Sequence, residues 1–119
     1  MLFSERIVSK IKETSPVVVG IDPNFDLMPE CLQPKSEDDV QEKLVLFSEL
    51  LINATYQQVP AVKIQSAYFE QYGTQGILAL KETIRYAKKK ELEVILDVKR
   101  GDIGTTSTAY AMGYLAPHN

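Results

Sequence analysis

Hydrophobic residues recur along this chain at two different spacings, and each change of spacing marks a new element. Apolar side chains first occur at every fourth position, which predicts a short amphipathic helix over residues 2–14. The apolar run 17–22, which follows Pro16, predicts a buried strand. Pro23 ends that strand because proline cannot donate to a sheet, and a proline-punctuated loop covers residues 24–35.

A second helix and a second strand follow the loop. Ser36 and Asp39 have the spacing of a capping box, and apolar residues then recur at helical intervals from Val40 to Ala54. This pattern predicts a helix of about five turns. The short apolar run 61–65 predicts the second strand.

The rest of the chain repeats this order. Gly73 and Gly76 indicate a loop, and apolar residues between 77 and 87 indicate another helix. A third strand is predicted over residues 94–99, and the start of a further helix over residues 105–115. The helical crossovers are long enough for parallel pairing, so the predicted class is α/β, with three parallel strands and crossover helices.

Ionisable side chains gather at the ends of the predicted strands. Asp22 ends the first strand, Lys63 belongs to the second, and Asp97 and Lys99 close the third. Sites in parallel α/β folds form at the carboxyl ends of strands, so these residues are expected to share one site.

The charges that follow the third strand support two interpretations. Asp97 and Lys99 share one strand face, and Gly101 allows a sharp turn that brings Asp102 to the cluster or to a neighbouring molecule. Adjacent carboxylates keep a lysine protonated, and a fixed lysine can give a proton to a carbanion or hold an anion. A structural ion-pair network needs no substrate. Charge placement alone supports both interpretations equally.

Composition and charge narrow the classes of partner. The chain has 119 residues, 45% of them hydrophobic and 24% charged, which predicts a globular domain. Acidic and basic residues are interspersed, with a net charge of -3, so a small molecule is expected as the partner rather than nucleic acid or a membrane. Cys31 is the single cysteine, and no apolar run reaches the roughly 20 residues of a membrane span. A cytoplasmic location is therefore expected.

Metal or cofactor binding is not expected. Asp22, Asp97 and Asp102 have the ligand chemistry for magnesium, but the nearby lysines compete with a cation. The chain has neither a glycine-rich dinucleotide fingerprint nor a Walker motif.

Three segments resemble one enzyme family. Asp97-x-Lys99-x-x-Asp102, continued through Ile103 to Thr106, resembles the signature of orotidine 5'-phosphate decarboxylase. Residues 19–23 (VGIDP) and 62–70 (VKIQSAYFE) are similar to the first and second strand motifs of that family. Their sequences most resemble those of its longer bacterial form. The three motifs stand in the right order and the match covers nearly the whole chain, which makes the resemblance specific.

The resemblance implies a fold and a reaction. The family forms a (β/α)8 barrel that converts orotidine 5'-phosphate to uridine 5'-phosphate in pyrimidine synthesis, without a metal or an organic cofactor. Residues 1–119 would be a single, incomplete domain from the N-terminal part of that TIM barrel.

The resemblance also assigns roles by motif position. Lys99 would donate the proton to C6 of the pyrimidine, and Asp97 would lie against the departing carboxylate. Lys63 would complete the charge network and contact the ribose, and Asp22 would bind a ribose hydroxyl.

Three more motif residues belong to the expected site. Asp102 and Thr106 would reach the neighbouring site across a homodimer, and Ile103 would contribute to substrate binding.

Length is the main departure from the family. A (β/α)8 barrel typically needs about 250 residues, and only three strands are predicted here. The phosphate-gripping arginine, the pyrimidine-reading loop and the last five strands have no counterpart. The chain is therefore expected to be an N-terminal part from a truncated gene or a partial sequence. It is expected to be inactive alone and to need a complementing segment or oligomerisation.

Two alternatives stay open. Related barrels use D-x-K-x-x-D on sugar phosphates with magnesium, in 3-keto-gulonate-phosphate decarboxylation or hexulose-phosphate synthesis. The contexts of residues 22–23 and 67–70 favour the orotidine enzyme. The other alternative is a non-catalytic barrel fragment whose charges form a structural network.

Overall fold

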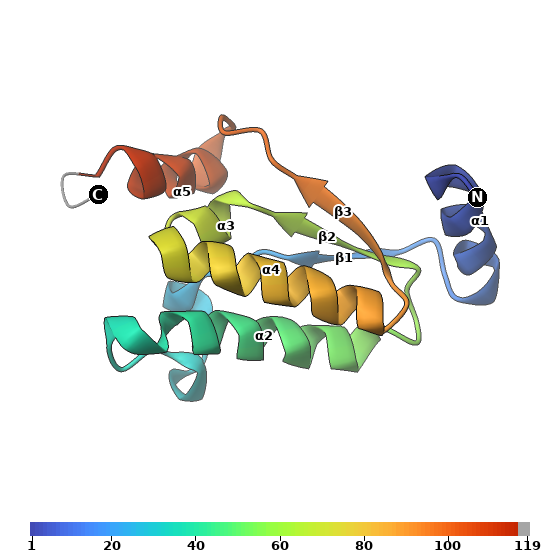
Figure 1. The fold of residues 1–119 in the computed structure, drawn as a ribbon, viewed down its shortest axis with the longest axis horizontal. Helices are drawn as coiled ribbons and strands as arrows, with labels where there is room; N and C mark the ends of the chain where they lie inside the picture. Colours follow the sequence, from blue (N-terminus) through green and yellow to red (C-terminus); the bar gives the residue numbers. More distant parts are fainter. Residues whose placement is uncertain (117–119) are drawn as a thin grey trace.

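A small parallel sheet flanked by helices forms the centre of the molecule (Figure 1). The computed structural model describes residues 1–116. The α-helices and strands in chain order are α1 (Phe3–Glu13), β1 (Val18–Ile21), α2 (Val40–Thr55), β2 (Ala61–Gln65), α3 (Ala67–Glu70), α4 (Gly73–Lys89), β3 (Glu93–Asp97) and α5 (Gly104–Tyr114), and three short 3-10 helices lie between β1 and α2. The strands run from the end that carries α1 toward the end that carries α3 and α5.

The sheet has the order β1-β2-β3, and both pairings are parallel. Gly20, Lys63 and Ile95 lie side by side, and Gln65 pairs with Asp97. The predicted α/β class, with three parallel strands joined by helical crossovers, is confirmed.

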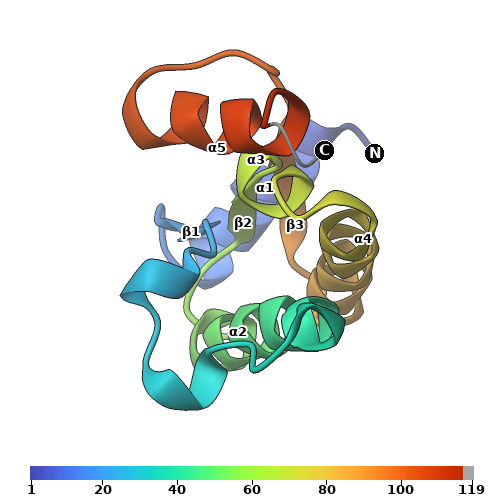
Figure 2. The same cartoon turned by 90° about the vertical axis from the view of Figure 1, so that its left-hand side faces the viewer.

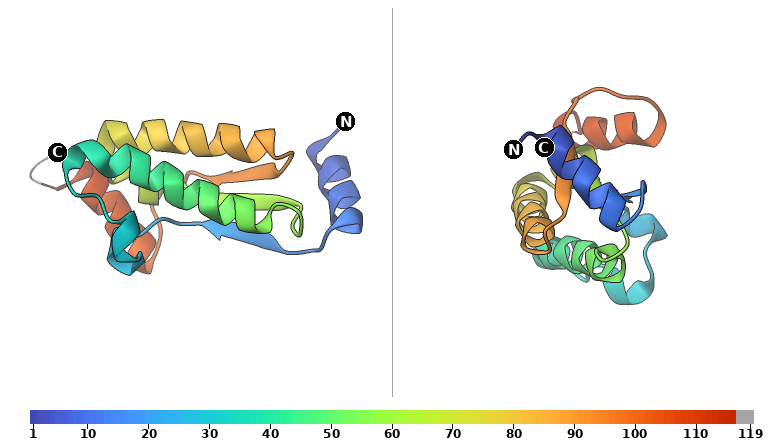
Figure 3. Two further views of the ribbon diagram at one scale, coloured as in Figure 1. Left: turned by 90° about the horizontal axis from the view of Figure 1, so that it is seen from below. Right: turned by 90° about the vertical axis from the view of Figure 1, so that its right-hand side faces the viewer.

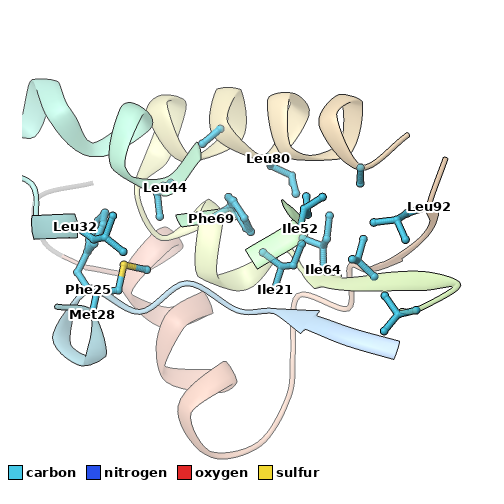
Figure 4. Close-up of a cluster of buried hydrophobic side chains, with 14 residues drawn as sticks. Ile21, Phe25, Met28, Leu32, Leu44, Ile52, Ile64, Phe69, Leu80 and Leu92 are labelled. Carbon is cyan, nitrogen blue, oxygen red and sulfur yellow. The ribbon is translucent and has the colours of Figure 1, made fainter. Parts of the chain in front are cut away.

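Helices α2 and α4 lie side by side and cover one face of the sheet (Figure 2). Alternate strand residues point to this face, where Ile21, Val62 and Ile64 are fully buried. They pack with side chains of the helices and the loops in one hydrophobic core (Figure 4). Full burial of such a side chain contributes about 1.5–3 kcal/mol, so this face holds the sheet and its two crossovers together.

Helix α1 lies across the amino ends of the strands, at the opposite end of the molecule from α5 (Figure 3). None of its residues is buried. Two ion pairs join it to the sheet: Glu93 of β3 pairs with Arg6 at 2.9 Å and with Lys10 at 3.2 Å. Hydrogen bonding from Arg6 lowers the pKa of Glu93, and the positive charges add to that effect.

The strand bounds differ from the prediction at both outer strands. Strand β2 has the predicted bounds, but β1 begins and ends one residue inside 17–22. Strand β3 covers 93–97 instead of 94–99. Its partner β2 ends at Gln65, where the chain turns into α3, so β3 has no neighbour to pair with beyond Asp97.

Two local predictions about the helices are wrong. The capping box does not form: Asp39 accepts the backbone N–H of Lys35 at 3.1 Å, and Ser36 makes no side-chain cap. Gly73 and Gly76 belong to α4 rather than to a loop. A Cβ at Gly76 would lie 1.7 Å from the Phe69 carbonyl oxygen, so glycine allows α4 to pack against α3, a helix that the periodicity did not reveal.

Candidate active site at the carboxyl ends of the strands

The strand register brings polar residues onto the sheet face opposite α2 and α4. Lys63 and Gln65 of β2 share this face because side chains alternate along a strand, and Asp97 stands beside Gln65. Lys63 was expected at a strand end, but it occupies the middle of β2. Gln65, which is 4% exposed, is the last residue of that strand.

Lys99 stands between two carboxylates. Its ammonium forms an ion pair with Asp97 and lies 3.9 Å from Oδ2 of Asp102. Both acids are largely buried, whereas the Lys99 side chain is 56% exposed. The hydrogen bond from Lys99 lowers the pKa of Asp97, and the positive charge of Lys63 lowers it further. The same hydrogen bond raises the pKa of Lys99, so the pair is ionised at neutral pH.

The loop after β3 turns at a residue that the sequence did not single out. Arg100 has a φ of 65°, whereas Gly101, where the turn was expected, does not have a positive φ. The Arg100 guanidinium pairs at 2.9 Å with Glu70 of α3, whose side chain is only 3% exposed. Lys99 and Asp102 pair with each other on either side of this turn. A buried acid therefore holds the middle of the charged segment.

Tyr110 of α5 is a second residue that sequence reasoning missed. Its side chain is buried, and its hydroxyl accepts the backbone N–H of Lys99 at 3.1 Å and donates to Oε1 of Gln65 at 3.1 Å. No spacing in the sequence indicates this contact, because 45 residues separate Tyr110 from Gln65. A tyrosine in a predicted helix was the only sequence signal, and its burial is visible only in the structure.

The remaining predicted site residues stand outside the ion-paired cluster. Oδ2 of Asp22 lies 3.6 Å from the position of a Cβ on Gly20, which places it on the Lys63 face. Within residues 1–116, Asp22 forms no ion pair. Ile103 is 85% exposed, and the Thr106 hydroxyl lies 3.3 Å from that of Tyr68.

Neither a cluster of metal ligands nor a membrane-spanning helix is found within residues 1–116. In residues 1–116, no three or more histidine, cysteine, aspartate or glutamate side chains are grouped so that they could hold a metal ion. No helix in the same part of the chain has the length and apolar character needed to cross a membrane.

The sequence matches one family over most of its length. Residues 15–118 match the orotidine 5'-phosphate decarboxylase / HUMPS family. The orotidine 5'-phosphate decarboxylase of Salinispora arenicola is 41% identical over 115 residues, which cover 97% of this chain and 40% of that protein. That of Petrotoga mobilis is 37% identical, over 92% of this chain and 38% of that protein. The chain thus spans about two fifths of the length of these relatives.

The fold leads to the same group. A putative orotidine 5'-phosphate decarboxylase from Streptomyces avermitilis superimposes with a TM-score of 0.64 at 33% identity, over 95% of this chain and 38% of that one. This chain matches only 38% of that structure, which agrees with the expectation of a partial (β/α)8 barrel. With a family match that covers nearly the whole sequence and solved relatives of the same fold, this chain belongs to the orotidine 5'-phosphate decarboxylase / HUMPS family.

Proposed function

We propose that this chain supplies the catalytic charges of an orotidine 5'-phosphate decarboxylase, which forms uridine 5'-phosphate in de novo pyrimidine synthesis. The observation that carries this proposal is the placement of Lys99 between Asp97 and Asp102 in a member of this family. The site needs an ammonium with a retained proton beside a carboxylate that stays ionised, and the two pKa shifts favour both states.

The reaction replaces a carboxylate on C6 of the pyrimidine with a proton. The bond from C6 to the carboxylate carbon breaks, carbon dioxide leaves, and the electron pair stays on C6. The Lys99 ammonium donates its proton to C6, and the neutral amine then regains a proton from water. Asp97, placed against the departing carboxylate, favours its loss by like-charge repulsion. Lys63 balances the charge of Asp97 and contacts the ribose.

The other motif residues have proposed roles in binding. Asp22, which lies on the Lys63 face, binds a ribose hydroxyl, and Ile103 contacts the substrate. Asp102 and Thr106 act across a homodimer, where the exposed segment around Ile103 brings them to the neighbouring site.

The same proposal covers the domain and its location. Residues 1–119 act as one incomplete barrel domain, which requires the rest of a barrel to form a closed pocket. The single cysteine fits a reducing compartment, so we place the reaction in the cytoplasm.

Complementation tests the proposed reaction. The chain is assayed for loss of orotidine 5'-phosphate absorbance alone and after fusion to the remaining barrel segment of the Salinispora arenicola relative. We expect turnover only in the fusion. Absence of turnover in both samples, with a folded fusion, would support a structural role for the charges instead.

The proton donor is tested in the same fusion. Replacement of Lys99 by alanine is expected to lower kcat by about 100- to 10,000-fold, the usual contribution of a positioned general acid. Lys81→Ala, at an exposed position of α4, is the matched control and should leave kcat unchanged. Near-normal turnover of folded Lys99→Ala protein would exclude the proposed proton donor.

The magnesium-dependent reaction of related barrels is the competing function. Chelator separates the two: activity of the fusion on orotidine 5'-phosphate should survive removal of divalent cations. Loss of that activity, with recovery on addition of magnesium, would favour the sugar-phosphate branch.

A further inference from the structure

The hydroxyl of Tyr110 lies at the junction of three elements. It accepts the backbone N–H of Lys99 at 3.1 Å, donates to Oε1 of Gln65 at 3.1 Å, and lies 3.2 Å from the hydroxyl of Ser66. A tyrosine hydroxyl has one proton to donate and two lone pairs to accept with, and these three contacts use all of them. Because Tyr110 and its partners Gln65 and Ser66 are each at most 4% exposed, water does not compete for these bonds.

The hydrogen bond from Tyr110 to Gln65 connects this hydroxyl to Asp97. The hydrogen bond from Tyr110 to Oε1 fixes which end of the Gln65 amide is free, and the free end is its NH₂ group. Gln65 is the register partner of Asp97. The hydrogen bond from Lys99 lowers the pKa of Asp97 most, and the Gln65 amide makes the smallest of the contributions that lower it. The orientation of Gln65 therefore depends on the hydroxyl of Tyr110.

The hydrogen bond from the Lys99 backbone connects the same hydroxyl to Lys99. Strand β3 ends at Asp97, so the backbone N–H of Lys99 has no partner in the sheet. Tyr110, whose own side chain is buried, supplies the acceptor for this N–H. One hydroxyl thus restrains both members of the ion pair, Asp97 through a side chain and Lys99 through the backbone.

Packing of α5 against α3 keeps the Tyr110 hydroxyl in place. Ala109 and Tyr110 pack on Ala67 of α3. A Cβ on Gly113 would lie 2.9 Å from the Cα of Gln71, so the two segments approach as closely as glycine allows. Small residues in α3 and α5 allow this close packing, which fixes the distance of α5 from the strand ends and the position of the Tyr110 ring.

From this geometry we propose that Tyr110 is a positioning residue of the site, which sets the orientation of Asp97 relative to Lys99 through Gln65 and through the Lys99 backbone. The inference rests on the proposed function for its catalytic meaning, but the contacts themselves do not depend on the reaction. It gives α5 a second part in the site besides that of Thr106, although α5 carries none of the proposed proton-transfer groups.

The first test measures Asp97 without substrate. NMR titration of the aspartate carboxyl carbons is carried out on the full chain with Tyr110→Phe, which removes the hydroxyl and keeps the ring. We expect the pKa of Asp97 to rise, since Gln65 loses its fixed orientation. Tyr86→Phe is the matched control, because its hydroxyl bonds Asn53 at 2.7 Å, away from the site. An unchanged Asp97 titration in folded Tyr110→Phe protein would overturn the inference.

A second variant keeps the test decisive if Tyr110→Phe does not fold. Gln65→Met retains the length of the side chain and removes the amide, so it should raise the pKa of Asp97 in the same way. Where both single variants fold, the shift in the double variant should be smaller than the sum of the two single shifts, because the two residues share the route through Gln65. Additive shifts, or no shift with Gln65→Met, would contradict the proposed route through Gln65.

Turnover gives the catalytic readout in the fusion protein. Tyr110→Phe is expected to lower kcat by about 10- to 100-fold with little change in KM, and to move the acid limb of the kcat profile to higher pH. A fusion that is inactive with the native Tyr110 would count against the proposed function alone, because the titration decides the positioning role separately. Equal kcat and pH profiles in Tyr110→Phe and Tyr86→Phe would overturn the catalytic part of the inference.

Discussion

At the scale of single residues, the charged segment after β3 depends on a buried acid of α3, outside the Asp97-x-Lys99-x-x-Asp102 signature. The Glu70 side chain is 3% exposed, and its only ion pair within residues 1–116 is the one with Arg100. In the same described part of the chain, its Oε2 has no hydrogen-bond partner. A buried carboxylate that loses its counter-charge is strongly destabilising, so Arg100 is expected to matter more for stability than its half-exposed position suggests.

Replacement of Arg100 by methionine tests this dependence. We expect the melting temperature at pH 7 to fall by roughly 5–10 °C, because Glu70 is left buried without its partner. Arg85→Met, at an exposed position of α4, should change it little. Adding Glu70→Gln to the Arg100 variant should recover part of the loss, since the stranded charge is gone. A double variant less stable than Arg100→Met would show that the pair is not the cause.

At the scale of elements, one acid pairs with two basic residues of α1, the helix with no buried residue. Glu93 of β3 binds Arg6 and Lys10 of α1, and its pKa lies below the ordinary value because Arg6 hydrogen-bonds it. A group whose pKa is lower in the folded state stabilises that state above its unfolded pKa, and this stabilisation is lost as the pH falls through the folded value. The attachment of α1 should therefore weaken in acid.

Glu93→Gln removes the charge and tests whether its stabilising effect is lost in acid. The variant should melt roughly 5 °C below the unmodified chain at pH 7, and the two should converge as the pH approaches 3. Melting is followed by circular dichroism across this range. Glu49→Gln, whose carboxylate has no ion pair in the described residues, serves as the control. A gap between Glu93→Gln and the unmodified chain that persists unchanged at pH 3 would rule out the charge as its origin.

Sequence patterns located these elements where the signal was local. The apolar run of β2 and the amphipathic spacing of α1 depend on neighbouring residues, and both were predicted within a residue or two. Gly76 was misplaced because its glycine serves a close approach to Phe69, which lies in a different helix. The sequence also placed Lys63 in the second strand, but only the register shows its neighbours.

The candidate site also contains some residues that local sequence spacing reveals and others that only the fold reveals. Asp97 and Lys99 stand two residues apart, so their pairing was visible in the sequence before any fold was known. Tyr110 reaches the same place from α5, and Glu70 from α3, through packing that no spacing encodes. Sequence reasoning therefore finds the charges of such a site more readily than the residues that hold them.

At the scale of the whole molecule, the sheet has one covered face and one open face. Val18 and Ile95 are 42% and 37% exposed on the open face, although both belong to strands. In residues 1–116, β1 and β3 each pair on one side only, which leaves two edges able to accept further strands. The chain covers about two fifths of its relatives, and in a barrel this face would turn inward.

The isolated chain is therefore expected to associate with itself. Its average mass in sedimentation velocity should rise with concentration, and it should bind a hydrophobic dye; fusion to the remaining barrel segment should reduce both effects. Ile95→Thr, on the open face, should weaken the association, whereas Leu78→Thr, similarly exposed on α4, should not. The two variants remove comparable apolar surface, so a difference between them reports the face rather than general hydrophobicity. A chain that stays monomeric at all concentrations and binds no dye would mean that its open face is stable in water without the rest of a barrel.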